Sequence, residues 1–352
     1  MKNILFLITV ISLIGCKKIS LEKNIVSKRI DFILHLKKQV GDNSWKEFGK
    51  KINEGPLFYY QKDTTYLFFI DKVVKENLLI TNHQKEYYKL KKRYDATPFH
   101  METQIEFEGD SKNPILLNHP IEFCSSPEET QKFIPSVTST EIWATMVIHE
   151  MFHHFQFNNS SFKNYMKSIT TLGFDNRNLK KLLDSDKTFK RDIIIENDLL
   201  LKVLVTKNKD SINSFLHLFL KKRIERRYKY NKVHPNFTKV EDAFEKMEGS
   251  ARYIEYQSMV IMRKLATTNS YAIKDDTLFN NYTDFKKFDI SNKDFKYLQT
   301  VSYDYYYTLG FNLLRVLDKL NINHQKMLFT IPEKSLTSFI SESQQNNKNY
   351  FK

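Results

Sequence analysis

The spacing of hydrophobic residues changes character near the middle of the chain. Between residues 56 and 125, short aromatic and β-branched runs are separated by Asn, Asp, Gly, Pro and Lys clusters, a pattern typical of a mostly antiparallel sheet. The expected strands are PLFYY, TTYLFFI, NLLIT, METQIEFE and PILLN. Between residues 136 and 345, apolar residues recur every three or four positions, as in amphipathic helices. The sequence therefore predicts an α+β fold, with the sheet first and a predominantly helical half after it.

Polar caps and apolar spacing locate the individual helices. TSTE at residues 138–141 and TKVE at residues 238–241 have capping-box spacing, so each predicts the start of a helix. The first of these helices should end near residue 158, and the second should be long. The other expected elements are a tether and one amphipathic helix within residues 16–50, three helices within 176–230, a loop over 267–294, a long helix over about 295–320 and a short helical tail.

The N-terminal sequence MKNILFLITVISLIGC is typical of an export signal. A basic Lys2 precedes an apolar run over residues 4–14, which is shorter than the ~20 residues of a transmembrane helix. The run ends in LIGC and resembles the bacterial lipobox, in which the cysteine is lipidated and becomes the first mature residue; an ordinary signal peptide with a chance cysteine is the alternative. We therefore expect residues 1–15 to be a lipoprotein signal peptide and Cys16 to anchor the chain to a bacterial membrane, on the extracytoplasmic side of the cell envelope.

Charge and cysteine content narrow the possible partners. The chain has 55 Lys and Arg against 41 Asp and Glu, a net charge of +14, and this charge is spread widely. Export makes nucleic acid an improbable partner, so we expect none, and a solvated basic surface near anionic lipid explains the charge more simply. Besides Cys16 the chain has only Cys124, which predicts no internal disulfide and a small buried residue.

The motif HEMFH, residues 149–153, carries the strongest chemical signal. On an α-helix, His149 and His153 share a face, so their imidazoles can both bind one Zn²⁺ at ~2.0–2.1 Å. Glu150 lies one step from His149, off the ligand axis, where it can hold a water molecule and accept its proton as general base. A catalytic zinc takes three protein ligands and leaves one position for water, so a third ligand is needed.

The third ligand is expected to be Glu248, on a second helix. The metzincin arrangement is absent, since HFQFNNSS follows His153. Glu248 opens the stretch EGSA inside a helical pattern, and its small residues would be explained if this helix packs closely against the HEMFH helix. Glu241 and Glu245 are rivals, but they lie in the acidic opening of the helix and are expected to be solvated. Glu255, two turns further on, is a rival that could instead support a ligand.

Three neighbouring residues have simpler interpretations than metal binding. His154 points ~100° away from His153 and is expected to pack in the interior or contact substrate. Gln156 is about one turn from His153 and could support this ligand through a hydrogen bond to its ring. Arg252, four residues after Glu248, could pair with that carboxylate or bind a substrate carboxylate, and the ion pair is favoured.

The motifs resemble those of gluzincin-type zinc metallopeptidases, which include thermolysin-like and aminopeptidase-N-like enzymes. The resemblance rests on HEMFHHFQ, MEGSARYIEY and Tyr307-Thr308-Leu309-Gly310, within residues 136–320. Aminopeptidase-N-like enzymes carry a Tyr-x-x-Gly element after the glutamate ligand, and its phenol stabilises the oxyanion. Here the separation from Glu248 to Tyr307 is 59 residues. The resemblance implies that role for Tyr307, with Tyr303 and Tyr306 as alternatives.

Departures from the family limit what the resemblance implies. The Gly-x-Met-x-Asn strand that captures a substrate amine is not found, and 94 residues separate His153 from Glu248, far more than in aminopeptidase N. We expect residues 51–352 to form a metallopeptidase-like domain with one Zn²⁺ per chain, which hydrolyses peptide or protein substrates with a zinc-activated water. The alternatives are a non-catalytic binding lipoprotein with a peptidase-like fold, and a zinc hydrolase of non-peptide amides or esters.

Overall fold

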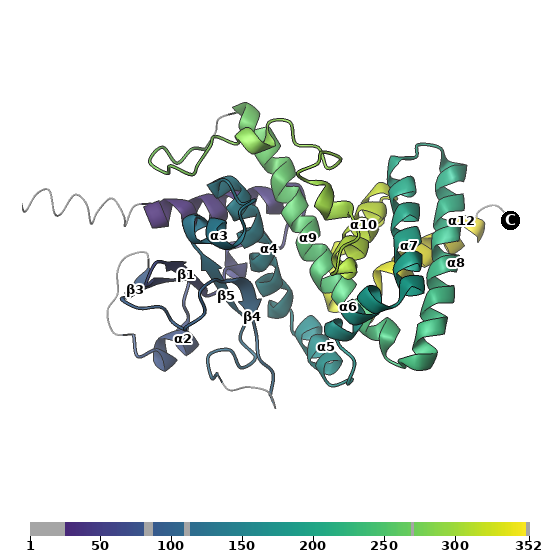
Figure 1. The fold of residues 1–352 in the computed structure, drawn as a ribbon, viewed down its shortest axis with the longest axis horizontal. Helices are drawn as coiled ribbons and strands as arrows, with labels where there is room; N and C mark the ends of the chain where they lie inside the picture. Colours follow the sequence, from purple (N-terminus) through teal and green to yellow (C-terminus); the bar gives the residue numbers. More distant parts are fainter. Residues whose placement is uncertain (1–24, 81–86, 109–112, 269–270, 350–352) are drawn as a thin grey trace, which may run out of the picture.

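The computed structural model describes residues 25–80, 87–108, 113–268 and 271–349, and the predicted signal peptide and Cys16 lie outside these ranges. The predicted α+β fold is confirmed: a sheet occupies one end of the molecule and a helical half the other (Figure 1). Residues 25–43 form the expected N-terminal helix beside the sheet. In the described ranges, no helix is both long enough and apolar enough to span a bilayer.

The sheet has five strands in the order β3-β2-β1-β5-β4, so β4 is an edge strand. β1 pairs in parallel with β5, and the other three pairings are antiparallel, which confirms the mostly antiparallel sheet. The strands are β1 (Leu57–Gln61), β2 (Thr64–Phe68), β3 (Tyr88–Leu90), β4 (Met101–Gln104) and β5 (Ile121–Ser125).

Alternating side chains give the sheet two buried faces. In β1, Leu57 and Tyr59 join the main core under the helices, whereas Phe58 and Tyr60 join a smaller core on the opposite face. Trp143 of α4 (Thr140–Asn158) is fully buried and donates its indole N–H to the carbonyl of Ser125 at 2.8 Å. α4 is thereby fixed against the sheet, with β4 and β5 beside it.

Two of the five expected strands are not strands. The run NLLIT follows α2 (Lys72–Asn77), which begins where the Asp71 side chain accepts the Val74 N–H at 3.1 Å. The helix ends at Asn77, and the apolar residues Leu78 and Leu79 form the turn that follows it, although this run alone resembles a strand. PILLN contributes only an isolated bridge between Leu117 and Glu106. The sheet uses β3 and β5 instead, and neither was among the expected runs.

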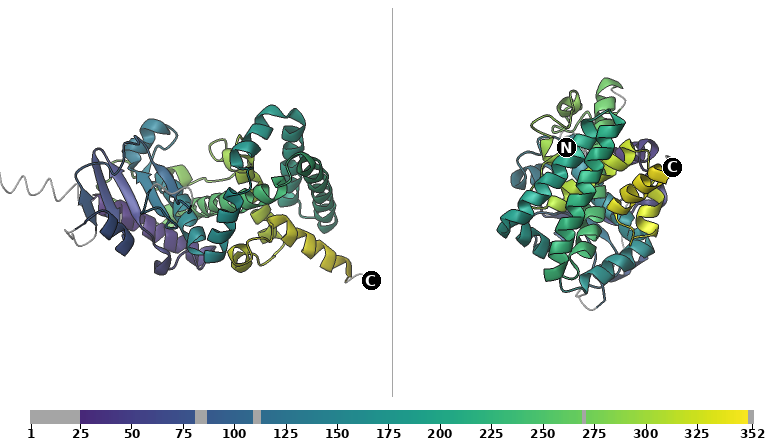
Figure 2. Two further views of the ribbon diagram at one scale, coloured as in Figure 1. Left: turned by 90° about the horizontal axis from the view of Figure 1, so that it is seen from below. Right: turned by 90° about the vertical axis from the view of Figure 1, so that its right-hand side faces the viewer.

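The helical half agrees more closely with the sequence. The three helices expected within residues 176–230 are α6, α7 and α8, and the last long helix begins at Tyr305 rather than near residue 295. Figure 2 shows α7, α8 and α12 grouped at the end away from the sheet. The remaining elements are α3 (Pro127–Phe133), α5 (Ser160–Thr170), α6 (Asn176–Ser185), α7 (Lys187–Val205), α8 (Lys209–Val233), α9 (Phe237–Thr268), α10 (Tyr305–Lys319), α11 (Gln325–Thr330), α12 (Leu336–Asn349) and 3-10 turns at Lys51–Asn53, Thr283–Phe285 and Lys296–Gln299.

The predicted capping box of α4 is wrong by one residue. Ser139 is the N-cap, and its hydroxyl accepts the Ile142 N–H at 3.3 Å. Glu141 does not cap the helix. It is fully buried and accepts the backbone N–H groups of Asn280 and Tyr282, which fixes the loop after α9 onto the start of α4.

Glu241 and Glu245 are buried, although the sequence predicts solvated charge. Both lie against the basic face of α8, where Arg226 donates to Glu241 at 2.8 Å and Arg223 donates to Glu245. Arg227 adds a bond to Glu241 at 2.8 Å. Because the partners are distant in sequence, the acidic start of α9 becomes a buried ion network that fixes α9 to α8. Glu241 therefore caps no helix, and neither residue faces the HEMFH motif.

The small residues of α9 face two neighbours: Gly249 allows close packing against α10, whereas Ser250 lies against α4, as predicted, and bonds to Gln156. Gly249 of α9 meets Gly310 of α10, and a Cβ added at Gly249 would lie 2.8 Å from the backbone nitrogen of Phe311. This space admits only hydrogen, so both glycines are needed for the close approach. The glycine of the Tyr-x-x-Gly element thus has a packing role that the motif alone does not indicate.

Candidate metal centre

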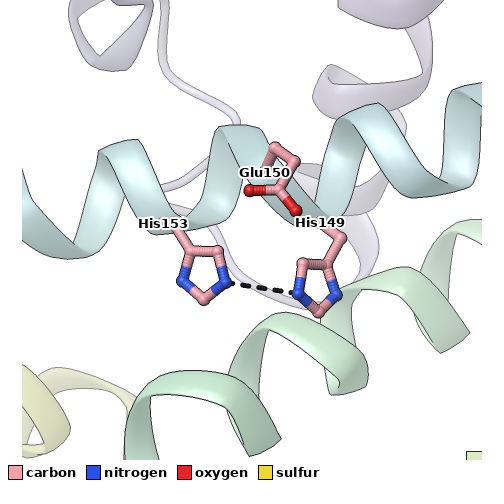
Figure 3. Close-up of side chains that lie close together, drawn as sticks. All are labelled: His149, Glu150 and His153. Carbon is pink, nitrogen blue, oxygen red and sulfur yellow. Dashed lines mark hydrogen bonds between the residues drawn. The ribbon is translucent and has the colours of Figure 1, made fainter. Parts of the chain in front are cut away.

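Three side chains from α4 and α9 converge at one point. His149 and His153, one turn apart on α4, bring their Nε2 atoms to 3.2 Å (Figure 3). From α9, Glu248 places Oε2 at 3.2 Å from His153 Nε2 and at 3.8 Å from His149 Nε2. The structure therefore brings together the three residues that the sequence predicts as ligands.

The three atoms have the spacing of a ligand set. A tetrahedral ion with bonds of ~2.0–2.1 Å separates its ligand atoms by about 3.3–3.4 Å. In the plane of the three observed atoms, the point equidistant from them lies about 2.0 Å from each. Glu248 Oε2 is buried and has no hydrogen-bond partner among the described residues, which is costly for a carboxylate oxygen unless a cation meets it.

The surroundings of the site favour positive charge. Although burial disfavours a charged imidazole, Glu248 and Glu255 raise the pKa of His149 to about 10. His149, Glu150 and His153 each offer a ligand atom, all within 4.8 Å of one another, so this buried group could hold a metal ion. A metal cation would be stabilised by the same carboxylates.

Both histidines also have a partner at Nδ1, the ring nitrogen that points away from the centre. His153 Nδ1 lies 2.9 Å from Gln156 Oε1, and His149 Nδ1 lies 3.4 Å from Glu255 Oε2. Both partner atoms accept a hydrogen bond, so each Nδ1 is the donor and each Nε2 is directed at the centre. The Tyr297 hydroxyl in turn donates to Glu255 Oε1 at 2.6 Å. Gln156 and Glu255 thus have the supporting role that the sequence left open for them.

Gln156 also connects the two ligand-bearing helices. Its Nε2 donates to Met247 O and to Ser250 Oγ, each at 2.8 Å. The side chain is fully buried. One residue therefore orients His153 and sets the distance from α4 to the turn of α9 that carries Glu248.

Glu150 is partly exposed beside the two histidines (Figure 3). Its backbone carbonyl accepts the Thr103 hydroxyl at 2.7 Å, so the edge strand β4 fixes this turn of α4. Burial raises the pKa of the Glu150 carboxyl above its ordinary value, while the neighbouring His153 and His149 act in the opposite direction. The carboxylate is placed to exchange a proton with a molecule bound at the centre.

Of the three candidate tyrosines, Tyr307 is the one against the site. Its ring stacks on His149 with centroids 6.0 Å apart and an interplanar angle of 12°. Burial and the charge of Glu248 raise its pKa, so the phenol keeps its proton and remains a donor. Tyr303 is 57 % exposed, and the Tyr306 hydroxyl donates to Asp304 at 3.0 Å.

Arg252 has partners other than the predicted Glu248. Its guanidinium lies 4.7 Å from the centroid of the Tyr307 ring and donates to Thr308 Oγ1 at 3.2 Å. Both contacts are with residues of α10, so the Arg252 side chain packs on α10. Within the described ranges, no ion pair joins Arg252 to Glu248.

His154 and Cys124 are interior residues, in agreement with the sequence. His154 is 3 % exposed and fills the space beside Gly55, where a Cβ would collide with its ring. Burial lowers the pKa of His154 to about 3. Cys124 is a free thiol that is 1 % exposed on β5, and burial raises its pKa.

A cavity of about 370 Å³ opens beside His153 and Glu248. Thr103 and Gln104 of β4, with the two residues that follow the strand, also line it. Thr103 and Tyr297 are site residues that sequence reasoning missed. Thr103 occurs in an ordinary alternating strand and Tyr297 at the start of the helix predicted over about 295–320, so no local pattern distinguishes them.

Comparisons of this chain with protein-family models, with curated proteins and with solved structures found no match.

Proposed function

We propose that the protein is a membrane-anchored, extracytoplasmic zinc metallopeptidase that hydrolyses peptide bonds. The observation that carries this proposal is the triangle of His149 Nε2, His153 Nε2 and Glu248 Oε2, with separations of 3.2, 3.2 and 3.8 Å. Glu150 lies beside that triangle. The set is similar to the centre of the gluzincin-type peptidases that the sequence motifs resemble.

Zinc suits the donor set better than other common cations. Two imidazole nitrogens and one carboxylate oxygen match catalytic zinc sites, whereas Mg²⁺ and Ca²⁺ prefer six or more oxygen ligands. A zinc ion held by these residues would supply Lewis acidity, which polarises a carbonyl group and makes water a better nucleophile near neutral pH. We expect one zinc per chain.

The proposed roles of the other site residues follow from their positions. Glu150 holds the attacking water, accepts its proton and returns a proton to the leaving amine. The Tyr307 phenol stays protonated and donates a hydrogen bond to the oxyanion that develops on the carbonyl oxygen. Gln156 and Glu255 keep the two imidazoles in the orientation that the ligands require.

An extended peptide is the substrate class that the neighbouring surface favours. The outer side of β4 has no partner strand among the described residues, and this strand lines the cavity at His153 and Glu248. A peptide in that cavity can add to the edge through main-chain hydrogen bonds, which bind a backbone whatever its side chains. The edge strand therefore supports peptide rather than small-ester hydrolysis.

Metal analysis tests the ligand assignment. The full chain, purified in detergent, should contain one zinc by mass spectrometry, and His153→Ala and Glu248→Ala should lose it. His217 is exposed on α8. His217→Ala is therefore a matched control and should retain zinc. A wild-type protein that binds no zinc would contradict the proposal and favour a non-catalytic binding lipoprotein.

Hydrolysis of a mixed peptide library, followed by mass spectrometry, tests the reaction. Glu150→Gln should retain zinc, because Glu150 is not one of the three proposed ligands. It should lose at least about 100-fold in rate, the usual contribution of a general base. Stoichiometric zinc without any peptide cleavage would refute peptide hydrolysis and favour a hydrolase of non-peptide amides or esters.

Anchoring by Cys16 is tested separately from catalysis. Wild-type cells grown with labelled palmitate should yield a labelled protein in the membrane fraction, and Cys16→Ser should remove the label. A Cys16→Ser chain that remains labelled would exclude Cys16 as the lipidated residue.

A further inference from the structure

The facing sides of α4 and α9 continue beyond the candidate metal centre. On α4, Ile142, Met146 and His149 are spaced by four and three residues and lie on one helix face. On α9, Glu248, Glu255 and Met259 share the facing side. His153 meets Glu248 and His149 meets Glu255, so the helices run antiparallel. Ile142, Met146 and Met259 therefore extend these facing sides beyond the ligands, away from His153.

This extension contains a cavity of about 710 Å³, within the usual range for ligand pockets. It begins next to the metal centre, because Glu255 belongs to its wall and places Oε2 at 3.4 Å from His149 Nδ1. Most of its wall is apolar, with side chains from α4, α9 and the loops that precede and follow them. The apolar lining residues are Ile134, Val137, Ile142, Met146, Met259, Phe285 and Phe295.

The charged residues of this cavity are all acidic. Its lining includes Glu255, Asp284 and Asp294, and no Lys, Arg or His. This is a local reversal, since the whole chain carries a net charge of +14. A ligand with an apolar stem and a positive end would match both the wall and the carboxylates.

The three carboxylates are not equally available to a ligand. Glu255 accepts from Tyr297 and contacts His149, and Asp284 accepts from Ser139 Oγ at 2.7 Å. Asp294 is exposed and has no hydrogen bond or ion pair with the residues that the structure describes. Asp294 is therefore the carboxylate that an incoming cation can pair with at the least structural cost.

We propose that this cavity is a specificity pocket for a lysine or arginine side chain, located near the bond that is cleaved. The substrate class is thus a peptide with a basic residue at one fixed position relative to that bond. The inference rests on the proposed peptidase function. It adds to that function a preference that the ligands and Glu150 do not determine.

Matched peptides test the preference. A reference peptide that the full chain cleaves is made in four versions, with Lys, Arg, norleucine or Glu at the selected position. Norleucine keeps the apolar stem of lysine and removes its charge. We expect kcat/KM for the Lys and Arg peptides to exceed that for the norleucine peptide at least about fivefold, with the Glu peptide slowest.

Substitutions at Asp294 assign the preference to this cavity. Asp294→Asn should reduce the ratio of kcat/KM between the Lys and norleucine peptides toward one, and Asp294→Lys should favour the Glu peptide over the Lys peptide. Asp289 is an exposed acidic residue of the same loop that is not part of the cavity. Asp289→Asn is the matched control and should keep the wild-type ratio.

The possible failures are distinguishable. Cleavage of all four peptides at similar rates, or an unchanged ratio in both Asp294 variants, would overturn the specificity pocket and leave the peptidase function intact. A wild-type chain that binds zinc but cleaves no member of a mixed peptide library would overturn the peptidase function, and the specificity pocket with it.

Discussion

Replacing Gln156 by Met should weaken zinc binding although Gln156 is not a ligand. The change keeps the length of the side chain and removes its three polar contacts: with His153 Nδ1 at 2.9 Å, and with Met247 O and Ser250 Oγ at 2.8 Å. His153 Nδ1 would then be an unpaired donor in a fully buried place, which costs about 1–3 kcal/mol.

The expected loss of affinity follows from the role of such outer partners. Removing a residue that orients a histidine ligand typically weakens metal affinity by about 10–100-fold, or about 1.4–2.7 kcal/mol. Gln156 also fixes the spacing between α4 and α9, so we expect a value in the upper part of this range. Competition between apo-protein and a fluorescent zinc chelator at pH 7 measures the dissociation constant directly.

Ser250→Ala is the matched control for this experiment. It removes one partner of Gln156 but keeps the bond between Gln156 and His153, so zinc affinity should stay within about threefold of wild type. Thermal unfolding of both variants in chelator measures the loss of stability without metal. If Gln156→Met binds zinc as tightly as wild type while its apo form unfolds at a lower temperature, Gln156 is only a structural link and the reasoning is wrong.

Further variants test the packing and charge of the fold. Gly310→Ala places a methyl group against the backbone of α9 and should cost about 1–3 kcal/mol in urea unfolding; an unchanged midpoint would contradict the close helix contact. Glu241→Gln leaves buried arginines without full compensation and should cost about 3–5 kcal/mol, whereas Glu225→Gln on the exposed side of α8 should change little. Burial opposes the charged form of Asp276, but bonds and charge from Arg29 outweigh it and hold its pKa below the ordinary value. Its stabilisation is therefore present above about pH 4 and lost as the pH falls through the native pKa, so the stability difference between wild type and Arg29→Met should be larger near pH 6 than near pH 3.

The α4 part of the site could be predicted because it depends on local spacing. The positions of His149, Glu150 and His153 within one helical pattern determine which side chains share a face, and the structure has that helix with those faces. Glu248 was selected because small residues follow it, and the structure supports that reason in part. Gly249 packs against Gly310 of α10, whereas Ser250 bonds to Gln156 of α4.

The positions of the other buried and site residues depend on contacts between separate segments of the chain. Glu241 has the same local pattern as a solvated helix start, and only its contact with Arg226 and Arg227 of α8 makes it a buried residue. Thr103 and Tyr297 reach the site because β4 and a loop happen to fold beside α4 and α9. A single sequence contains no periodicity that connects such positions, so neither residue could have been predicted.

The geometry of the candidate metal centre depends on α9, which uses different faces for different neighbours. Glu241 and Glu245 bind α8, Gly249 packs on α10, and Glu248 with Glu255 faces α4. A rigid helix transmits rotation along its length, so the buried ion network at Glu241 and Glu245, about two turns and less than one turn before Glu248, helps to set where Glu248 lies. Isolated buried ion pairs are weak sources of stability, but here they hold α9 against α8 and so help to orient the helix that brings Glu248 to the two histidines.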